Sequence, residues 1–127
     1  MIKFDEQKQF DSVQNALALR GQIEQIVDAV CSAGFRNLYF LGIGGTWASA
    51  LQAEVHMKER SALWVNALLA SEYNTTGNRC VGSGSVVIFS SVTGTTVEVV
   101  EAVRRAKEAG AVILGFVDTP DTPLYTM

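Results

Sequence analysis

The chain has 127 residues, of which 48% are hydrophobic and 18% charged, and its formal net charge is −3. This length suits one domain with a buried core, and the lack of a basic stripe argues against general nucleic-acid binding. The first ten residues are charged where a signal peptide needs an apolar run, and no apolar run is long enough for a membrane span. We therefore expect a cytoplasmic protein with neither nucleic acid nor a membrane as its partner.

Helical periodicity dominates the first quarter of the chain. Apolar residues recur there at three- and four-residue spacing, which predicts a helix in one or two pieces; they are Phe10, Val13, Leu17, Ile23, Ile26, Val27 and Val30. Gly34 follows as a C-terminal cap. The continuous apolar run 38–41 then predicts a buried strand, and residues 46–60 return to a helical composition.

The rest of the chain alternates in the same way. Residues 63–65 form a short second strand, and 71–79 form a loop or a turn of helix. The run 86–89 predicts the third strand, 95–109 a strong helix, and 111–117 the fourth strand. The expected buried side of that helix carries Val97, Val100, Val103 and Ala106 or Lys107. Its charged residues are expected to form a solvated face with i,i+4 pairing; they are Glu101, Arg104, Arg105, Lys107 and Glu108.

Apolar strands that alternate with helices predict an α/β fold, a three-layer αβα arrangement around an open parallel, flavodoxin-like sheet. We expect one domain over residues 1–127, with residues 1–20 as a helical extension. The pattern calls for at least one more element after the fourth strand, so the fold is expected to be incomplete at its C-terminus. Another copy or further chain would complete the sheet, and an exposed edge favours a homo-oligomer.

Ligands of open α/β sheets bind beyond the carboxyl ends of the strands. Three segments occupy such ends: the glycine loop (42–46), the hydroxyl loop (90–96) and the third loop (118–123). The glycine loop begins like a dinucleotide fingerprint, but Trp47 stands where that fingerprint has Gly or Ala, and no P-loop lysine follows. The two cysteines, Cys31 and Cys80, fit no metal spacing and are expected to be buried or inert. We expect no cofactor and no metal.

The hydroxyl loop suits a phosphate. It carries Ser91, Thr93 and Thr96 around Gly94 and leads directly into a helix. Helix N-termini offer free N–H groups and a favourable dipole to an anion, and hydroxyls add donors without adding charge. The alternative at this point is that Thr95 caps the helix and the other hydroxyls face water.

The two loops together resemble the SIS (sugar isomerase) domain family, which carries a glycine turn after its first strand and an S-x-S-G-x-T loop after a later one. Here they read GIGGTW and SVTGTT, about 45 residues apart, and the resemblance covers roughly residues 20–124. It implies that the phosphosugar is bound by Gly44, Gly45, Thr46, Ser91, Thr93, Gly94 and Thr96. Departures are Thr in place of Ser at 46 and 93, Val92 where a polar residue is frequent, and Thr95 where Glu is frequent. The third loop matches the family only loosely, through Asp118 and residues 122–124.

Within the family, the sequence is most similar to fructosamine-6-phosphate deglycases and to the isomerase half of glucosamine-6-phosphate synthase. Because those proteins carry two SIS domains per chain, the resemblance implies the N-terminal half of a longer protein acting on a phosphorylated sugar or sugar-amine. The alternative is a regulatory domain that senses a sugar phosphate without catalysis. In the two-domain relatives the catalytic carboxylate and histidine lie beyond this segment, so the chain alone is expected to be inactive.

Three residues are weak candidates for the base that aldose–ketose proton transfer needs. Glu54 and His56 lie on the helix after the glycine loop, and Glu72 lies in the loop after the second strand. The first two are otherwise surface or interface residues, and Glu72 otherwise stabilises a helix N-terminus. Tyr73 and Asn74 are further candidates for lining a sugar pocket.

Overall fold

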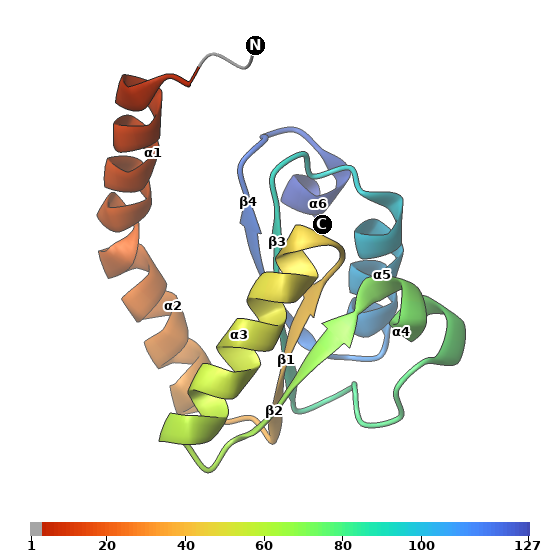
Figure 1. The fold of residues 1–127 in the computed structure, drawn as a ribbon. Helices are drawn as coiled ribbons and strands as arrows, with labels where there is room; N and C mark the ends of the chain where they lie inside the picture. The colour runs from red at the N-terminus through yellow and green to blue at the C-terminus, as the bar shows by residue number, and fades with distance from the viewer. Residues whose placement is uncertain (1–3) are drawn as a thin grey trace. The chain divides into compact units, whose positions relative to one another are not determined.

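Four parallel strands form the predicted sheet, in the spatial order β2-β1-β3-β4 (Figure 1). The structure is a computed structural model that describes residues 4–127. Every apolar run predicted to be a strand is one, and the strands are β1 Asn37–Gly42, β2 Trp64–Leu69, β3 Ser85–Ser91 and β4 Val112–Val117. The predicted bounds of β2 were wrong: it runs on to Leu69, because residues 66–69 pair in register with 39–42 of β1.

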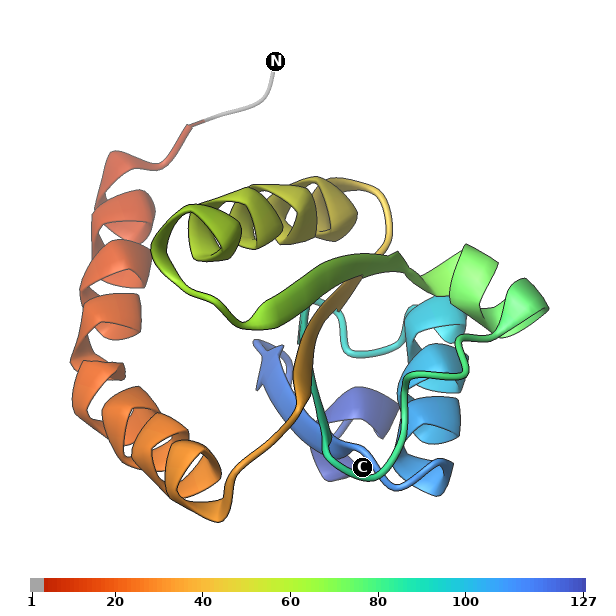
Figure 2. The same cartoon turned by 90° about the horizontal axis from the view of Figure 1, so that it is seen from below.

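Helices cover both faces of this sheet, as expected for three layers. The helix α3 (Gly45–Arg60) lies on one face, and the other face carries α4 (Ala70–Thr76), α5 (Val97–Glu108) and α6 (Pro123–Thr126) (Figure 2). The short α4 corresponds to the segment predicted as a loop or a turn of helix. The single turn of α6 was not predicted, although Pro123 at its start has the fixed φ that suits a first helical position.

The core lies between the sheet and the α4–α5 layer. Tyr39 and Val87, at its centre, are fully buried. The predicted buried side of α5 was wrong in part, because Val97 is 75% exposed. The residues that α5 buries are Val99, Ala102, Val103 and Ala106. Two of these are alanines, whose small side chains allow a close approach to the sheet and give only a weak apolar signal in the sequence.

Among the described residues, 4–34 belong to one compact unit and Phe35–Met127 to a second. Within the first unit, α1 (Glu6–Ala18) and α2 (Arg20–Ala33) confirm the predicted helix in its two-piece form. The Asp5 carboxylate accepts from the Lys8 N–H at the start of α1, and Gly34 is the C-cap of α2.

Over residues 4–127, no helix combines the length and apolar character that crossing a membrane requires. Cys31 and Cys80 are free thiols, and both are exposed rather than buried.

Candidate functional site

The glycine loop and the hydroxyl loop meet at one pocket at the carboxyl ends of β1 and β3. The pocket has a volume of about 180 Å³. Its lining comprises Ile43 and Thr46 from the first loop, Ser90, Ser91, Val92, Thr93 and Thr96 from the second, and Val99 of α5. Four predicted phosphosugar residues, at positions 46, 91, 93 and 96, are therefore brought together, although the two loops are far apart in the sequence.

The glycine loop offers backbone donors rather than a side chain. The Thr46 hydroxyl accepts from the Ile43 N–H (3.0 Å) and donates to the Ile43 carbonyl (2.9 Å), so it is engaged within its own loop. Gly44 is the N-cap of α3, and Gly45 is the first residue of that helix. The first N–H groups of a helix have no partner within the helix. The amides of residues 45–47 therefore have no partner within α3, and Thr46 is the one of these three residues that lines the pocket.

The hydroxyl loop offers both amides and side chains. The buried Ser91 accepts from the Gly94 N–H through its hydroxyl oxygen (3.0 Å), which leaves the hydroxyl proton free to donate. Thr93 accepts a long 3.4 Å contact from the Thr95 N–H. Thr96, rather than the Thr95 considered above, is the N-cap of α5, and its side chain makes no cap hydrogen bond. Ser91, Thr96 and the first amides of α5 can therefore donate to a ligand.

The third loop and the start of α6 donate hydrogen bonds to the backbone of the hydroxyl loop. The Asp118 N–H donates to the Ser91 carbonyl (3.2 Å), and Thr119 donates to the Val92 carbonyl through both its N–H (3.2 Å) and its hydroxyl (2.7 Å). The Leu124 N–H donates to the Gly94 carbonyl (3.1 Å). Asp118 and Thr122 are not among the pocket's lining residues, so this loop holds the hydroxyl loop in place.

None of the residues that line the described pocket is charged. An anion there would be bound by hydroxyls, by amides and by the N-terminal dipoles of α3 and α5. Such groups suit a compact, doubly charged oxygen cluster better than an extended cation or an apolar ligand.

The three candidate bases lie outside the lining of this pocket. Glu54, on α3, accepts from the Ala67 N–H of edge strand β2 (2.7 Å) and pairs with Lys58. The His56 ring lies 3.2 Å from the Arg60 guanidinium, on the exposed side of the same helix. Glu72 is exposed in the first turn of α4. None of the three lines the pocket, and Glu54 holds α3 to β2.

Glu54 should make folding sensitive to acid. Burial raises the pKa of its carboxyl, but the hydrogen bonds from Lys58 and from the Ala67 N–H outweigh this and hold the pKa below its usual range. A carboxyl with a lowered pKa stabilises the fold at neutral pH and loses that contribution as pH falls below about 4.5. Urea unfolding between pH 3 and 7 measures the free energy of unfolding, and we expect it to fall less with decreasing pH in Glu54→Gln than in wild type. Glu59→Gln, at an exposed position, is the control. If the free energy of unfolding of E54Q falls as steeply with decreasing pH as that of wild type, Glu54 does not stabilise the fold in this way.

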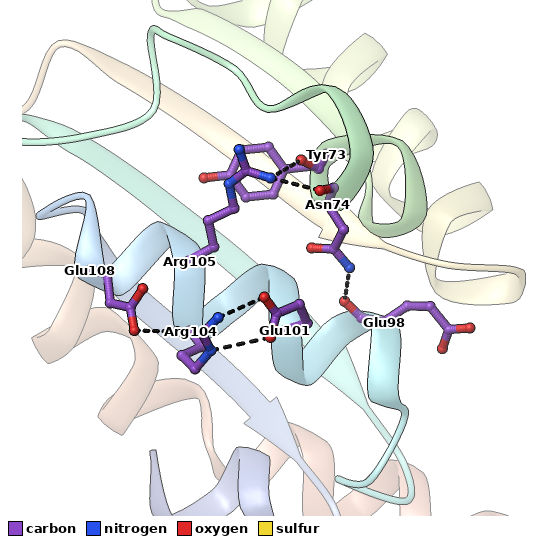
Figure 3. A network of polar contacts seen from close by, with 7 residues as sticks. All are labelled: Tyr73, Asn74, Glu98, Glu101, Arg104, Arg105 and Glu108. Atoms are coloured by element: carbon purple, nitrogen blue, oxygen red, sulfur yellow. Dashed lines mark hydrogen bonds and ion pairs between the residues drawn. The ribbon is translucent and has the colours of Figure 1, made fainter.

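The two neighbouring arginines of α5 have different partners (Figure 3). Arg104 pairs with Glu101 and Glu108 on its own helix, which confirms the predicted solvated face for these residues. Arg105 instead donates to the Tyr73 and Asn74 carbonyls of α4. Asn74, considered above for a sugar pocket, donates its side-chain amide to the Glu98 carbonyl (2.8 Å). No signal in the sequence separates Arg105 from Arg104, because only the packing of α4 distinguishes them.

Known proteins resemble this chain in sequence and in fold. The family model described as SIS domain matches residues 33–127. A glutamine–fructose-6-phosphate aminotransferase (isomerizing) from Chlorobaculum tepidum is 32% identical over 95 residues, which are 75% of this chain and 15% of that protein. The chain thus spans only a small part of this curated relative.

Two solved structures share the fold at lower identity. Tagatose-6-phosphate ketose/aldose isomerase from Escherichia coli matches with a TM-score of 0.77 and 16% identity, over 91% of this chain and 33% of that chain. The C-terminal domain of glucosamine-fructose-6-phosphate aminotransferase from Francisella tularensis matches with a TM-score of 0.63 and 20% identity, over 72% of this chain and 26% of that chain.

Proposed function

Because this chain belongs to the SIS domain family, we propose that it binds the phosphate group of a 6-phosphosugar or a phosphorylated sugar-amine in the pocket between the glycine and hydroxyl loops. The observation that carries the proposal is the convergence of two helix N-termini and three hydroxyl residues, Ser91, Thr93 and Thr96, on one uncharged pocket. The names of the aminotransferase and isomerase relatives, both of which refer to 6-phosphosugars, support this class of ligand.

The chemistry of the pocket matches a phosphate monoester. Such a group carries nearly two negative charges at neutral pH and several acceptor oxygens, which the amides of residues 45–47 and the start of α5 can bind. Each hydrogen bond to a charged group contributes about 1.5–3 kcal/mol. The hydroxyls of Ser91 and Thr96 add such bonds without the charge of a lysine or arginine.

For the whole protein we propose aldose–ketose isomerisation or deglycation, with this chain as the phosphate-binding part. Both reactions move a proton between C1 and C2 of the sugar and need a base near those carbons. Glu54, His56 and Glu72 lie outside the lining of the pocket, so the base would come from another domain or another copy. The chain alone should bind without turnover; robust isomerase activity measured with it would place the base on α3 or α4.

A sugar-phosphate sensor is the second candidate, favoured by the same lack of a carboxylate or imidazole among the described lining residues. A sensor and a half-site bind alike, so the whole protein's turnover separates them.

Self-association also stays a prediction, and it rests on the edge strand β4, whose six residues VILGFV carry no charge.

The double variant Ser91→Ala, Thr93→Ala tests the phosphate site. By calorimetry we expect wild type to bind glucose 6-phosphate and not glucose, and the double variant to bind at least about tenfold more weakly, because one lost bond to a charged group is enough for that factor. Thr95→Ala is the matched control, since Thr95 is exposed in the same loop and does not line the pocket. Equal affinities of wild type and double variant, or equal binding of glucose, would overturn the proposal.

A further inference from the structure

We propose that Asn74 and Arg105 are positioning residues of the ligand site. They hold the N-terminus of α5 in the position and orientation that phosphate binding needs. The inference rests on the proposed function. Neither residue lines the pocket, and each would act through the helix that presents the donors.

The first link joins α4 to the binding end of α5. The Asn74 amide donates to the Glu98 carbonyl (2.8 Å), and Glu98 is the second residue of α5. Thr96, which lines the pocket, lies two residues earlier and caps the same turn. A bond to Glu98 therefore acts within the first turn of α5, whose free amides are the groups proposed to bind the phosphate.

The second link returns from α5 to α4. One guanidinium nitrogen of Arg105 donates to the Tyr73 carbonyl (3.0 Å) and the Asn74 carbonyl (2.7 Å), and the guanidinium carbon lies 5.3 Å from the centre of the Tyr73 ring (Figure 3). The Asn74 carbonyl lies in the last turn of α4, where carbonyls lack partners within the helix. The Tyr73 carbonyl also accepts from the Gly77 N–H (2.9 Å), and Arg105 adds a second donor to it, so Arg105 caps the end of α4. Gly77 leaves space for the Arg105 guanidinium, because a Cβ at this position would lie 2.8 Å from an Arg105 nitrogen.

The sheet anchors this pair of links. Ala70, the first residue of α4, directly follows Leu69, the last residue of β2. Ala70 and Tyr73 are both buried in the core cluster. The end of β2, α4 and the first turn of α5 are therefore joined through backbone and side-chain contacts, and α4 fixes α5 against the sheet.

Binding should depend on this fixation because hydrogen bonds weaken steeply outside a narrow range of distance and angle. Donors that come from two helices must also be held to within a fraction of an ångström of one another. Loosening α5 would displace the amides of its first turn relative to those of the glycine loop, and the two sets could no longer bind one phosphate together.

Arg104 provides the matched control. It is the neighbouring residue on α5 and carries the same charge, but within the part of the chain that the structure describes its side-chain hydrogen bonds go only to Glu101 and Glu108 on that helix. We expect Arg105→Ala to weaken binding of glucose 6-phosphate about fivefold or more, as positioning substitutions do, and Arg104→Ala to change it less than about twofold. Arg105→Lys, which keeps the charge and can make one of the two bonds, should fall between wild type and R105A.

If R105A does not fold, Asn74→Ala tests the same inference, because this substitution removes one hydrogen bond and no charge. We expect N74A to weaken binding about threefold, and the N74A/R105A pair to lose less than the product of the single effects, since both act through one link. Equal losses in R104A and R105A would show that only net charge matters and would overturn the inference. So would lower thermal stability of N74A and R105A with unchanged affinity. Failure of wild type to bind glucose 6-phosphate would instead contradict the proposed function.

Discussion

Replacing Gly94 with alanine should be among the most damaging single substitutions in the hydroxyl loop. Gly94 has a φ of +67°, and a Cβ there would lie 1.9 Å from the Thr122 hydroxyl oxygen and 3.1 Å from a Val117 methyl carbon. Left-handed backbone costs a non-glycine residue about 1–2 kcal/mol, and overpacking adds about 1–3 kcal/mol. We expect the free energy of unfolding to fall by roughly 2–5 kcal/mol in total.

Ligand binding should be lost with it. The Gly94 N–H donates to the Ser91 hydroxyl and the Gly94 carbonyl accepts from the Leu124 N–H, so a shift of this residue displaces the whole loop. Urea unfolding and calorimetry with glucose 6-phosphate measure the two effects. Gly21→Ala is the control, because a Cβ there meets nothing within 4 Å and alanine suits a helix interior better than glycine. A G94A protein as stable as wild type would contradict the packing described for this loop.

Replacing Tyr39 with phenylalanine should stabilise the protein, most of all in alkali. Tyr39 is fully buried, and its hydroxyl has no hydrogen-bond partner among residues 4–127. A buried unsatisfied polar group costs about 1–3 kcal/mol, so we expect Tyr39→Phe to raise the free energy of unfolding by about 1 kcal/mol at neutral pH.

The alkaline effect follows from the pKa of Tyr39. Burial, aided by the neighbouring Cys80 and Tyr73, raises this pKa from 10.0 to about 12. The unfolded chain therefore loses the phenolic proton first, and stability falls as pH rises from 10 through the folded pKa. A difference of about two pH units corresponds to roughly 2–3 kcal/mol.

Urea unfolding of wild type and Y39F at several pH values from 7 to 11.5 tests both effects. We expect the two curves to diverge above pH 10. Tyr125→Phe is the control, because Tyr125 is 57% exposed, and it should leave the alkaline loss in place. Parallel curves for wild type and Y39F would show that Tyr39 does not titrate as described.

Much of the fold could be predicted from hydrophobic pattern. The strands β1, β3 and β4 are short continuous apolar runs followed by loops, a pattern that predicts strands buried on both faces. The central strands β1 and β3 are mostly buried, whereas the edge strand β4 contains no buried residue. The extent of β2 was not predictable, because Asn66 interrupts its apolar run and its length is set by pairing with β1. Similarly, the buried side of α5 runs through Ala102 and Ala106, whose weak hydrophobicity cannot outweigh Val97 in a pattern.

The candidate site was predictable in part for a physical reason: parallel strands end at the same edge of a sheet, so loops that follow neighbouring strands must meet. This reasoning brought Thr46 and Ser91 together. It could not show that the Thr46 hydroxyl is engaged by Ile43, because that depends on the loop's own geometry. The distinct roles of Arg104 and Arg105 depend on where α4 packs, which local pattern does not encode.

If amides from the starts of two helices bind one phosphate, a titration with glucose 6-phosphate followed by amide NMR will detect them together. We expect the largest ligand-induced shifts to occur together in residues 45–47 and 96–98, with inorganic phosphate shifting the same amides and glucose shifting none. Shifts in only one of the two segments, or a ligand response confined to other parts of the sheet, would contradict it.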